Sequence, residues 1–264
     1  MQLVGAALTA AIVADSAPPP AVGAIPVLPP PAASAPALSP GWSGTGEFSY
    51  TDVSGNSSVA LLASGLTLKR VRDSRYELEV GGLVRYGEAA GDATVENYVG
   101  SARVRFEPAG AVSPYVSAGW QRDVVRGIRA RFAAQAGAEA NLVRAARDRR
   151  VAVGLALLRD FESRSLPPDS PEPETVSRNR LNASLTMQLP LREGVNLEHR
   201  MLLEPATDDF EDYFFLWRTA VRVGLTRVVA LQTTFQFDRD NIPPPGVEYR
   251  DERTLSAGVL LGVN

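Results

Sequence analysis

The chain has 264 residues and no cysteine, which excludes a disulfide framework, a thiolate metal site and a redox motif. A single histidine excludes a histidine-rich metal centre, and a formal net charge of −3 argues against general nucleic-acid binding. The mean hydropathy of −0.07 is too polar for a bundle of membrane helices, but a membrane β-barrel has such a value because half of each strand faces water.

The first 41 residues predict a leader and a linker that precede a folded domain. The apolar run Leu3–Ala14 is too short for a spanning helix, which needs about twenty residues, and it is typical of a signal peptide over residues 1–14. An alanine-rich disordered leader is the alternative. Residues 15–41 are dense in proline and alanine, which predicts a disordered, semi-rigid tether. A ligand for a proline-recognition module is the less common alternative.

From Trp42 onward, apolar and polar residues alternate with a period of two. Within residues 75–86, for example, Glu77, Glu79 and Arg85 share one parity and apolar residues take most of the other. Such alternation predicts strands with one apolar and one polar face. We expect about twelve strands, at residues 42–53, 57–69, 75–87, 94–107, 113–124, 128–143, 150–161, 179–191, 194–204, 212–225, 228–238 and 252–263. Many exceed the length of about five or six residues that is usual in globular proteins.

An even number of long alternating strands predicts an all-β fold, a transmembrane up-and-down antiparallel β-barrel over residues 42–264. The connections after odd-numbered strands include long acidic ones, of which residues 162–178 form the longest. Those after even-numbered strands are mostly short and basic. We therefore expect the acidic end outside the cell and the basic end in the periplasm. A soluble β-sandwich, with its apolar faces turned inward, is the alternative.

If the apolar face contacts lipid, the polar face lines the lumen. The candidate lumen-lining charges are Glu47, Glu77, Glu79, Arg85, Arg103, Arg105, Glu139, Glu198, Arg200, Arg218 and Arg222, with Asp160, Arg180 and Asp238 on the same parity. One hypothesis is a charged eyelet that selects small polar or ionic solutes. The other is a set of cross-strand ion pairs that fills a narrow barrel. The mixture of signs favours neutralisation by ion pairs over a filter of a single sign.

His199 is the one imidazole and therefore the one histidine that could act as a general base. Outer-membrane phospholipases of twelve strands have a serine two residues after a lipid-facing histidine, but Met201 occupies that position here. The acidic run at residues 208–212 lacks the ligand spacing and glycine of a calcium loop. We therefore expect no catalytic, cofactor-binding or metal-binding residues.

Two passages carry a resemblance to a known family. The first is Gly41-Trp42-Ser43-Gly44, followed by Tyr50 and Ser54-Gly55-Asn56. The second is the stretch Tyr115–Asp123, followed by Arg126-Gly127-Ile128. Both resemble the salt-induced outer-membrane proteins, a bacterial outer-membrane β-barrel family of unknown function. The resemblance implies a barrel without an established activity, so no functional residue is carried over.

These observations together predict a non-enzymatic protein of the bacterial outer membrane, either a narrow pore or an envelope-stabilising barrel, with a link to osmotic or salt stress that the resemblance implies. The expected partners are outer-membrane lipids, the barrel-assembly machinery during biogenesis, and small solutes, but not nucleic acid. The alternatives are an outer-membrane lipid-modifying enzyme and a soluble periplasmic lipid-binding β-protein.

Overall fold

The computed structural model describes residues 41–53, 59–72, 75–89, 92–124, 127–145, 149–166, 173–242 and 251–263. Residues 1–40 and the predicted turn at residues 54–56 lie outside the described residues. The strands are β1 (Gly41–Val53), β2 (Val59–Arg72), β3 (Tyr76–Ala89), β4 (Asp92–Phe106), β5 (Val112–Asp123), β6 (Ile128–Ala145), β7 (Arg149–Arg164), β8 (Thr175–Arg192), β9 (Val195–Pro205), β10 (Tyr213–Gly224), β11 (Val229–Asp240) and β12 (Asp251–Val263).

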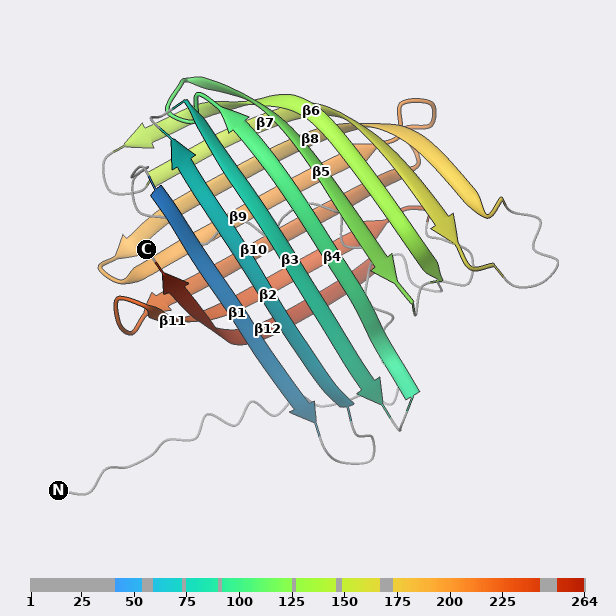
Figure 1. The fold of residues 1–264 in the computed structure, drawn as a ribbon, viewed down its shortest axis with the longest axis horizontal. Helices are drawn as coiled ribbons and strands as arrows, with labels where there is room; N and C mark the ends of the chain where they lie inside the picture. Colours follow the sequence, from blue (N-terminus) through green and yellow to red (C-terminus); the bar gives the residue numbers. More distant parts are fainter. Residues whose placement is uncertain are drawn as a thin grey trace.

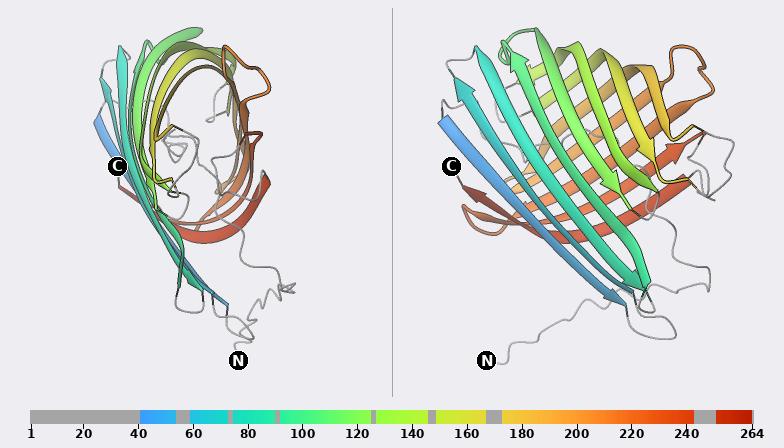
Figure 2. Two further views of the ribbon diagram at one scale, coloured as in Figure 1. Left: turned by 90° about the vertical axis from the view of Figure 1, so that its right-hand side faces the viewer. Right: turned by 45° about the vertical axis from the view of Figure 1, so that its right-hand side comes forward.

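Each strand pairs antiparallel with the next, and β12 pairs with β1, so the sheet closes into a barrel (Figure 1). The view turned by 90° looks into the ring of strands (left panel of Figure 2). The prediction of an all-β, up-and-down barrel of twelve strands is therefore confirmed. The β-sandwich alternative is wrong, because one sheet closes on itself and no second sheet packs against it. Within the described residues, no helix is long and apolar enough to cross a membrane.

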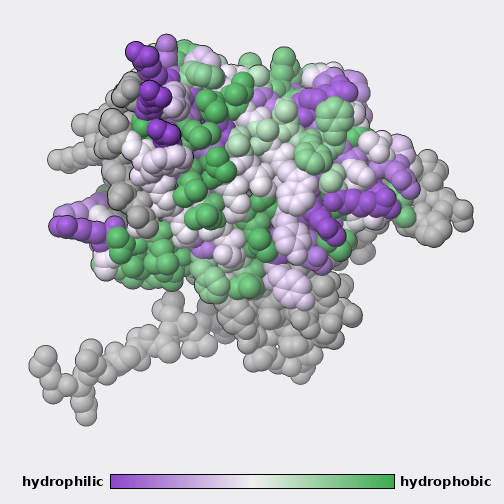
Figure 3. Space-filling model, in the orientation of Figure 1, coloured by the Kyte–Doolittle hydropathy of each residue, from purple (hydrophilic) through white to green (hydrophobic). Residues whose placement is uncertain are grey.

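The two faces of the barrel wall follow the sequence alternation. Along β5, Ser113, Tyr115 and Ser117 are buried, whereas Pro114 and Val116 between them are exposed. Large apolar side chains lie on the outer face, as the hydrophobic region across the middle of the surface illustrates (Figure 3). Because successive side chains of a strand point to opposite faces, a closed sheet of such strands has a polar interior and an apolar exterior.

The ends of β7 and β8 that are joined by the longest predicted connection differ from the sequence prediction. We expected a loop over residues 162–178, but β7 continues to Arg164 and β8 already begins at Thr175. Glu162 and Arg164 continue the inward-facing parity of Asp160 and are buried. The charges of these residues favoured a solvated loop in the sequence analysis. Inside a polar lumen, however, charged side chains are compatible with a paired strand.

Strands β6 and β7 approach so closely at Gly137 that a Cβ there would lie 2.2 Å from the carbonyl oxygen of Leu155. The closure between β1 and β12 is short, because its register runs only over residues 44–48 and 259–263. By contrast, β1 pairs with β2 along its whole length.

Candidate functional site: the charged lumen

The predicted lumen-lining charges all occupy inward-facing positions of their strands. Five of them, together with Asp160, Arg180 and Asp238, are buried: these five are Glu77, Glu79, Arg105, Glu139 and Glu198. The other six are partly exposed: Glu47, Arg85, Arg103, Arg200, Arg218 and Arg222. Strand pairing gathers many of these side chains, with residues that the sequence prediction omitted, into two networks, one nearer each end of the barrel.

Glu139 on β6 is the centre of the network nearer the short turns. Its carboxylate accepts hydrogen bonds from Arg103, from Nη1 of Arg105 at 3.0 Å and from Nη2 of Arg150 at 2.6 Å. Arg105 also donates to Glu77. One carboxylate thus accepts from three guanidinium groups, one of which it shares with Glu77. Charge-assisted hydrogen bonds of this kind are the strong ones in proteins.

Two members of this network, Lys69 and Arg150, are absent from the sequence-based set. The Nζ atom of Lys69 lies 2.8 Å from Oε2 of Glu77. Both residues lie at the ends of their predicted strands, residues 57–69 and 150–161, and the sequence analysis does not assign them to either face of the sheet. Their parity is the signal that could have identified them, since it matches that of the inward-facing residues of the same strands.

Tyr115 brings an aromatic ring into the lumen beside these charges. It is buried, and the guanidinium carbon of Arg103 lies 4.0 Å from its ring centroid, in cation–π contact. Arg200 on β9 also lies within electrostatic range of both Tyr115 and Arg103, although β9 does not neighbour β4 or β5 in the sheet. Side chains from different parts of the wall therefore lie close enough inside the barrel to influence one another electrostatically.

The second network lies nearer the long loops. Nη2 of Arg131 lies 2.8 Å from Oδ2 of Asp160. Asp212 receives two guanidinium groups, from Arg180 at 2.8 Å and from Arg178 at 3.0 Å. Asp160 and Asp212 thus each have a cationic partner on another strand or segment, an arrangement of mutually neutralising charges.

Neutral polar side chains connect strands in the same region. Asn182 on β8 donates to Oε1 of Glu204 at 2.6 Å and to Oε1 of Gln135 at 3.0 Å. Gln135 in turn donates to Oγ of Ser117 at 2.8 Å. Sequence reasoning did not select these residues, because an uncharged polar residue of inward parity carries no distinctive signal before its partners are known.

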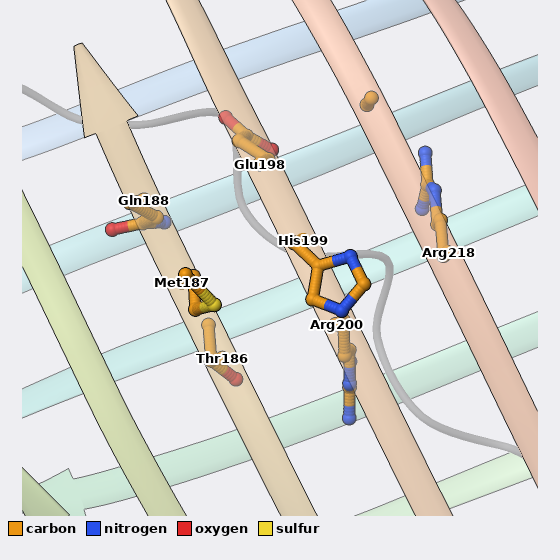
Figure 4. Close-up of a pocket in the computed structure, with 8 residues that line it drawn as sticks. Thr186, Met187, Gln188, Glu198, His199, Arg200 and Arg218 are labelled. Carbon is orange, nitrogen blue, oxygen red and sulfur yellow. The ribbon is translucent and has the colours of Figure 1, made fainter.

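A small cavity lies on the wall formed by β8, β9 and β10 (Figure 4). Its volume is about 10 Å³, roughly the space of one water molecule. The inward-facing residues that line it are Thr186, Gln188, Glu198, Arg200, Arg218 and Ala220. Arg200 and Arg218 are directly opposite one another on β9 and β10. Met187 and His199, which take the outward parity, also line the cavity, and the surface that it exposes is almost entirely apolar.

The backbone of this wall also carries His199, whose side chain points to the outer face. Nδ1 of His199 lies 2.9 Å from Oγ1 of Thr219, and Nε1 of Trp217 donates to that oxygen at 3.0 Å. Met201, two residues after His199, follows the same outward parity, as expected. The threonine was not foreseen, because its position depends on the pairing of β9 with β10, which the sequence does not reveal. Among the described residues, no group of three metal-ligating side chains is arranged to hold an ion.

Several solved structures are similar to the chain in overall path. The NanC porin shares 5% identity over 83% of this chain and 98% of its own, with a TM-score of 0.49. The translocator domain of the autotransporter NalP from Neisseria meningitidis shares 12% identity over 84% and 87%, with a TM-score of 0.47. The outer-membrane channel of Pseudomonas putida F1, COG4313, shares 14% identity over 86% and 97%, with a TM-score of 0.45.

No curated protein matches the chain. One family profile does, over residues 46–261, which are nearly the whole barrel. The family is described as a protein of unknown function, so the match brings neither a salt-induced character nor an assigned activity. The chain belongs to this family, DUF481.

Proposed function

We propose that the protein is a non-enzymatic β-barrel of the bacterial outer membrane and that its lumen is a narrow pore for small hydrophilic solutes. The observation that carries the proposal is the division of the wall into an apolar outer face and a charged inner face. Leu155, Leu157 and Leu255 on the outer face are 63%, 65% and 70% exposed, a surface that would be costly in water and is favourable in lipid.

We also propose an orientation for the barrel and a set of partners. The acidic loops, such as residues 206–212, would face the outside, and the short basic turns would face the periplasm. Lipids would contact the outer face, and the barrel-assembly machinery would insert the chain behind its signal peptide. A role in osmotic or salt stress is the most specific part of the proposal, and it rests on the family resemblance alone.

Electrical recording of the purified full-length chain in a planar lipid bilayer tests the pore. We expect discrete openings of small conductance in potassium chloride, because charged side chains occupy much of the lumen. Folded protein, identified by a gel migration that changes on boiling, must be present in the same sample. Folded barrels that insert but never open would contradict the pore and leave the envelope-stabilising role.

A lipid-modifying enzyme is the second candidate, and the contact between His199 and Thr219 is the observation that favours it. A hydroxyl within hydrogen-bond distance of an imidazole is the arrangement of an activated nucleophile. However, the partners that the structure gives to this imidazole are Thr219 and Trp217, and neither is an acid that could orient it as a base. We therefore expect no phospholipid hydrolysis or acyl transfer; activity that disappears in both H199A and T219A would favour the enzyme instead.

A further inference from the structure

We propose that Arg122, Arg129 and Arg159, hereafter the outer arginine cluster, bind the phosphate headgroup of an anionic lipid in the membrane leaflet beside the long loops. The three residues lie on the outer face of β5, β6 and β7, which are consecutive strands of the barrel (Figure 1). The site rests on the membrane location proposed above, and it does not depend on whether the lumen conducts.

A β-bulge at the long-loop end of the barrel places two of these arginines on neighbouring strands. Two residues of β6, Arg129 and Ala130, stand between buried positions where regular alternation has one. The register of β6 with both adjacent strands shifts here, which puts Arg122 of β5 opposite the bulge. Arg122 and Arg129 are both exposed. Like charges on neighbouring strands destabilise a sheet, so a bound anion would offset their repulsion.

Arg159 begins nearer the middle of the wall and extends toward the same end. Its guanidinium carbon lies 5.1 Å from the ring centroid of Phe161, an exposed outer-face residue two positions nearer the end of β7. Nη1 of Arg159 donates to Oδ1 of Asn179 at 2.9 Å. A long basic side chain on a lipid-facing surface typically extends in this way so that its charge reaches the headgroups. The contact with Phe161 therefore directs the charge of Arg159 toward the long-loop end.

The charges of the outer arginine cluster are not neutralised within the part of the chain that the structure describes. Arg129 donates from Nε to Oγ of Ser165 at 2.9 Å, just as Arg159 donates to a neutral amide oxygen. Among the described residues, no carboxylate forms an ion pair with any of the three arginines. Glu96 on β4 shares the outward parity, but its carboxylate accepts a hydrogen bond from Tyr98 at 3.4 Å.

The opposite side of the same rim provides a contrast. Arg239 on β11 lies 3.5 Å from Oδ1 of Asp251, its direct partner on β12, so this pair has no net charge to offer an anion. Arg253 on the same side is a single cation, 5.9 Å from the ring centroid of Phe237. The concentration of three cations without an acidic partner thus distinguishes the outer face of β5 to β7.

A row of aromatic rings beside the cluster matches the remainder of a lipid. Trp120, Phe132 and Phe161 are successive cross-strand partners on β5, β6 and β7. Leu155 and Leu157 continue the exposed apolar surface toward the middle of β7. Aromatic rings are typical of the boundary between headgroups and hydrocarbon, and guanidinium groups donate strong hydrogen bonds to phosphate. A phosphate joined to acyl chains would satisfy both parts of this surface, whereas a free anion would contact the arginines alone.

Native mass spectrometry of the full-length barrel tests the site. The protein is folded in micelles that contain equal amounts of phosphatidylglycerol and phosphatidylcholine with the same acyl chains. We expect the wild type to retain phosphatidylglycerol in about tenfold excess, the factor that one charge-assisted hydrogen bond contributes. R122Q/R129Q/R159Q should lose this excess. If the folded triple variant kept it, the site would be overturned.

A second triple variant, R75Q/R227Q/R239Q, is the matched control. It removes the same number of charges, two from exposed turns at the other end of the barrel and one from the pair with Asp251. We expect it to retain the excess of phosphatidylglycerol. Loss of the excess in this control as well would mean that the net charge of the barrel attracts the lipid, which would contradict a localised site.

The single variants R122Q and R129Q protect the test against a triple variant that does not fold. Each removes one exposed side chain, and gel migration that changes on boiling identifies the folded protein. We expect each to reduce the excess of phosphatidylglycerol, though less than the triple variant does. An undiminished excess in both folded single variants would overturn the contribution of the bulge and with it the site.

Competition and assembly measurements distinguish the lipid from other occupants. Sodium phosphate added in excess should leave the retained phosphatidylglycerol unchanged, because a free anion lacks the acyl chains. Displacement by phosphate would overturn the lipid as the ligand, and so would a wild-type dimer that dissociates in R122Q/R129Q/R159Q. Flotation with phosphatidylcholine vesicles separates the two proposals. A barrel that inserts but retains no excess of phosphatidylglycerol would overturn the site alone, whereas a barrel that does not insert would overturn the membrane location.

Discussion

Glu139 is a single carboxylate that holds three guanidinium groups in place, so its charge affects more than one contact. Replacing it by glutamine would leave Arg103, Arg105 and Arg150 crowded without their shared counter-ion. Breaking a buried ion pair from one side costs about 3–5 kcal/mol. We therefore expect E139Q to lower the free energy of unfolding by about that amount, measured by urea titration of the refolded barrel in lipid vesicles.

The control for this variant is Glu211, which lies in an exposed loop. E211Q should change the free energy of unfolding by less than about 0.5 kcal/mol, as is usual for surface substitutions. If E139Q proved as stable as E211Q, water in the lumen would already be screening the three arginines, and the ion-pair network would contribute little to the fold.

At the scale of elements, the contact between β6 and β7 depends on the absence of one side chain. A Cβ at Gly137 would lie 2.2 Å from the carbonyl oxygen of Leu155 and 2.4 Å from Cβ of Ala156. Since backbone atoms cannot move aside easily, G137A should force the two strands apart. We expect a loss of about 1–3 kcal/mol in the free energy of unfolding, the usual cost of overpacking.

Gly82 on β3 provides the comparison for this prediction. A Cβ there would lie 3.7 Å from the nearest neighbouring atom, the carbonyl oxygen of Val99, which is an ordinary contact. G82A should therefore be close to neutral in the same urea titration. Equal effects of G82A and G137A would indicate that the cost comes from β-strand propensity and not from the close approach of the strands.

The strands could be predicted from the sequence because their signal is local. Alternation at residues 75–86 requires only that neighbours along the chain point to opposite faces. Glu77 and Arg105, which parity alone selected, are both buried. The pairing between strands is not local. That Arg200 would lie opposite Arg218, or Thr219 opposite His199, depends on the register of β9 with β10, which no short stretch of sequence specifies.

At the scale of the whole molecule, the outer surface predicts how the barrel responds to a misplaced charge. Leu155 is 63% exposed near the middle of β7 and faces away from the lumen. An arginine in the middle of a lipid-facing band costs about 2–4 kcal/mol. We therefore expect L155R to lower the free energy of unfolding in lipid vesicles by that amount.

The same substitution at the rim should be tolerated. Leu225 is 56% exposed just beyond the end of β10, where an arginine reaches water and headgroups. L225R should cost about 0–1 kcal/mol in the same vesicles. If L155R were as mild as L225R, the apolar face would be meeting water and not hydrocarbon, and the proposed location of the barrel would be wrong.

The short closure between β1 and β12 has a further consequence for the life of the molecule. These two strands come from opposite ends of the folded chain, so their meeting is the most distant contact in sequence and must wait until every hairpin between them exists. It is also held by fewer backbone hydrogen bonds than the first hairpin. We therefore expect the pairing of β1 with β12 to form last during assembly and to separate first on heating.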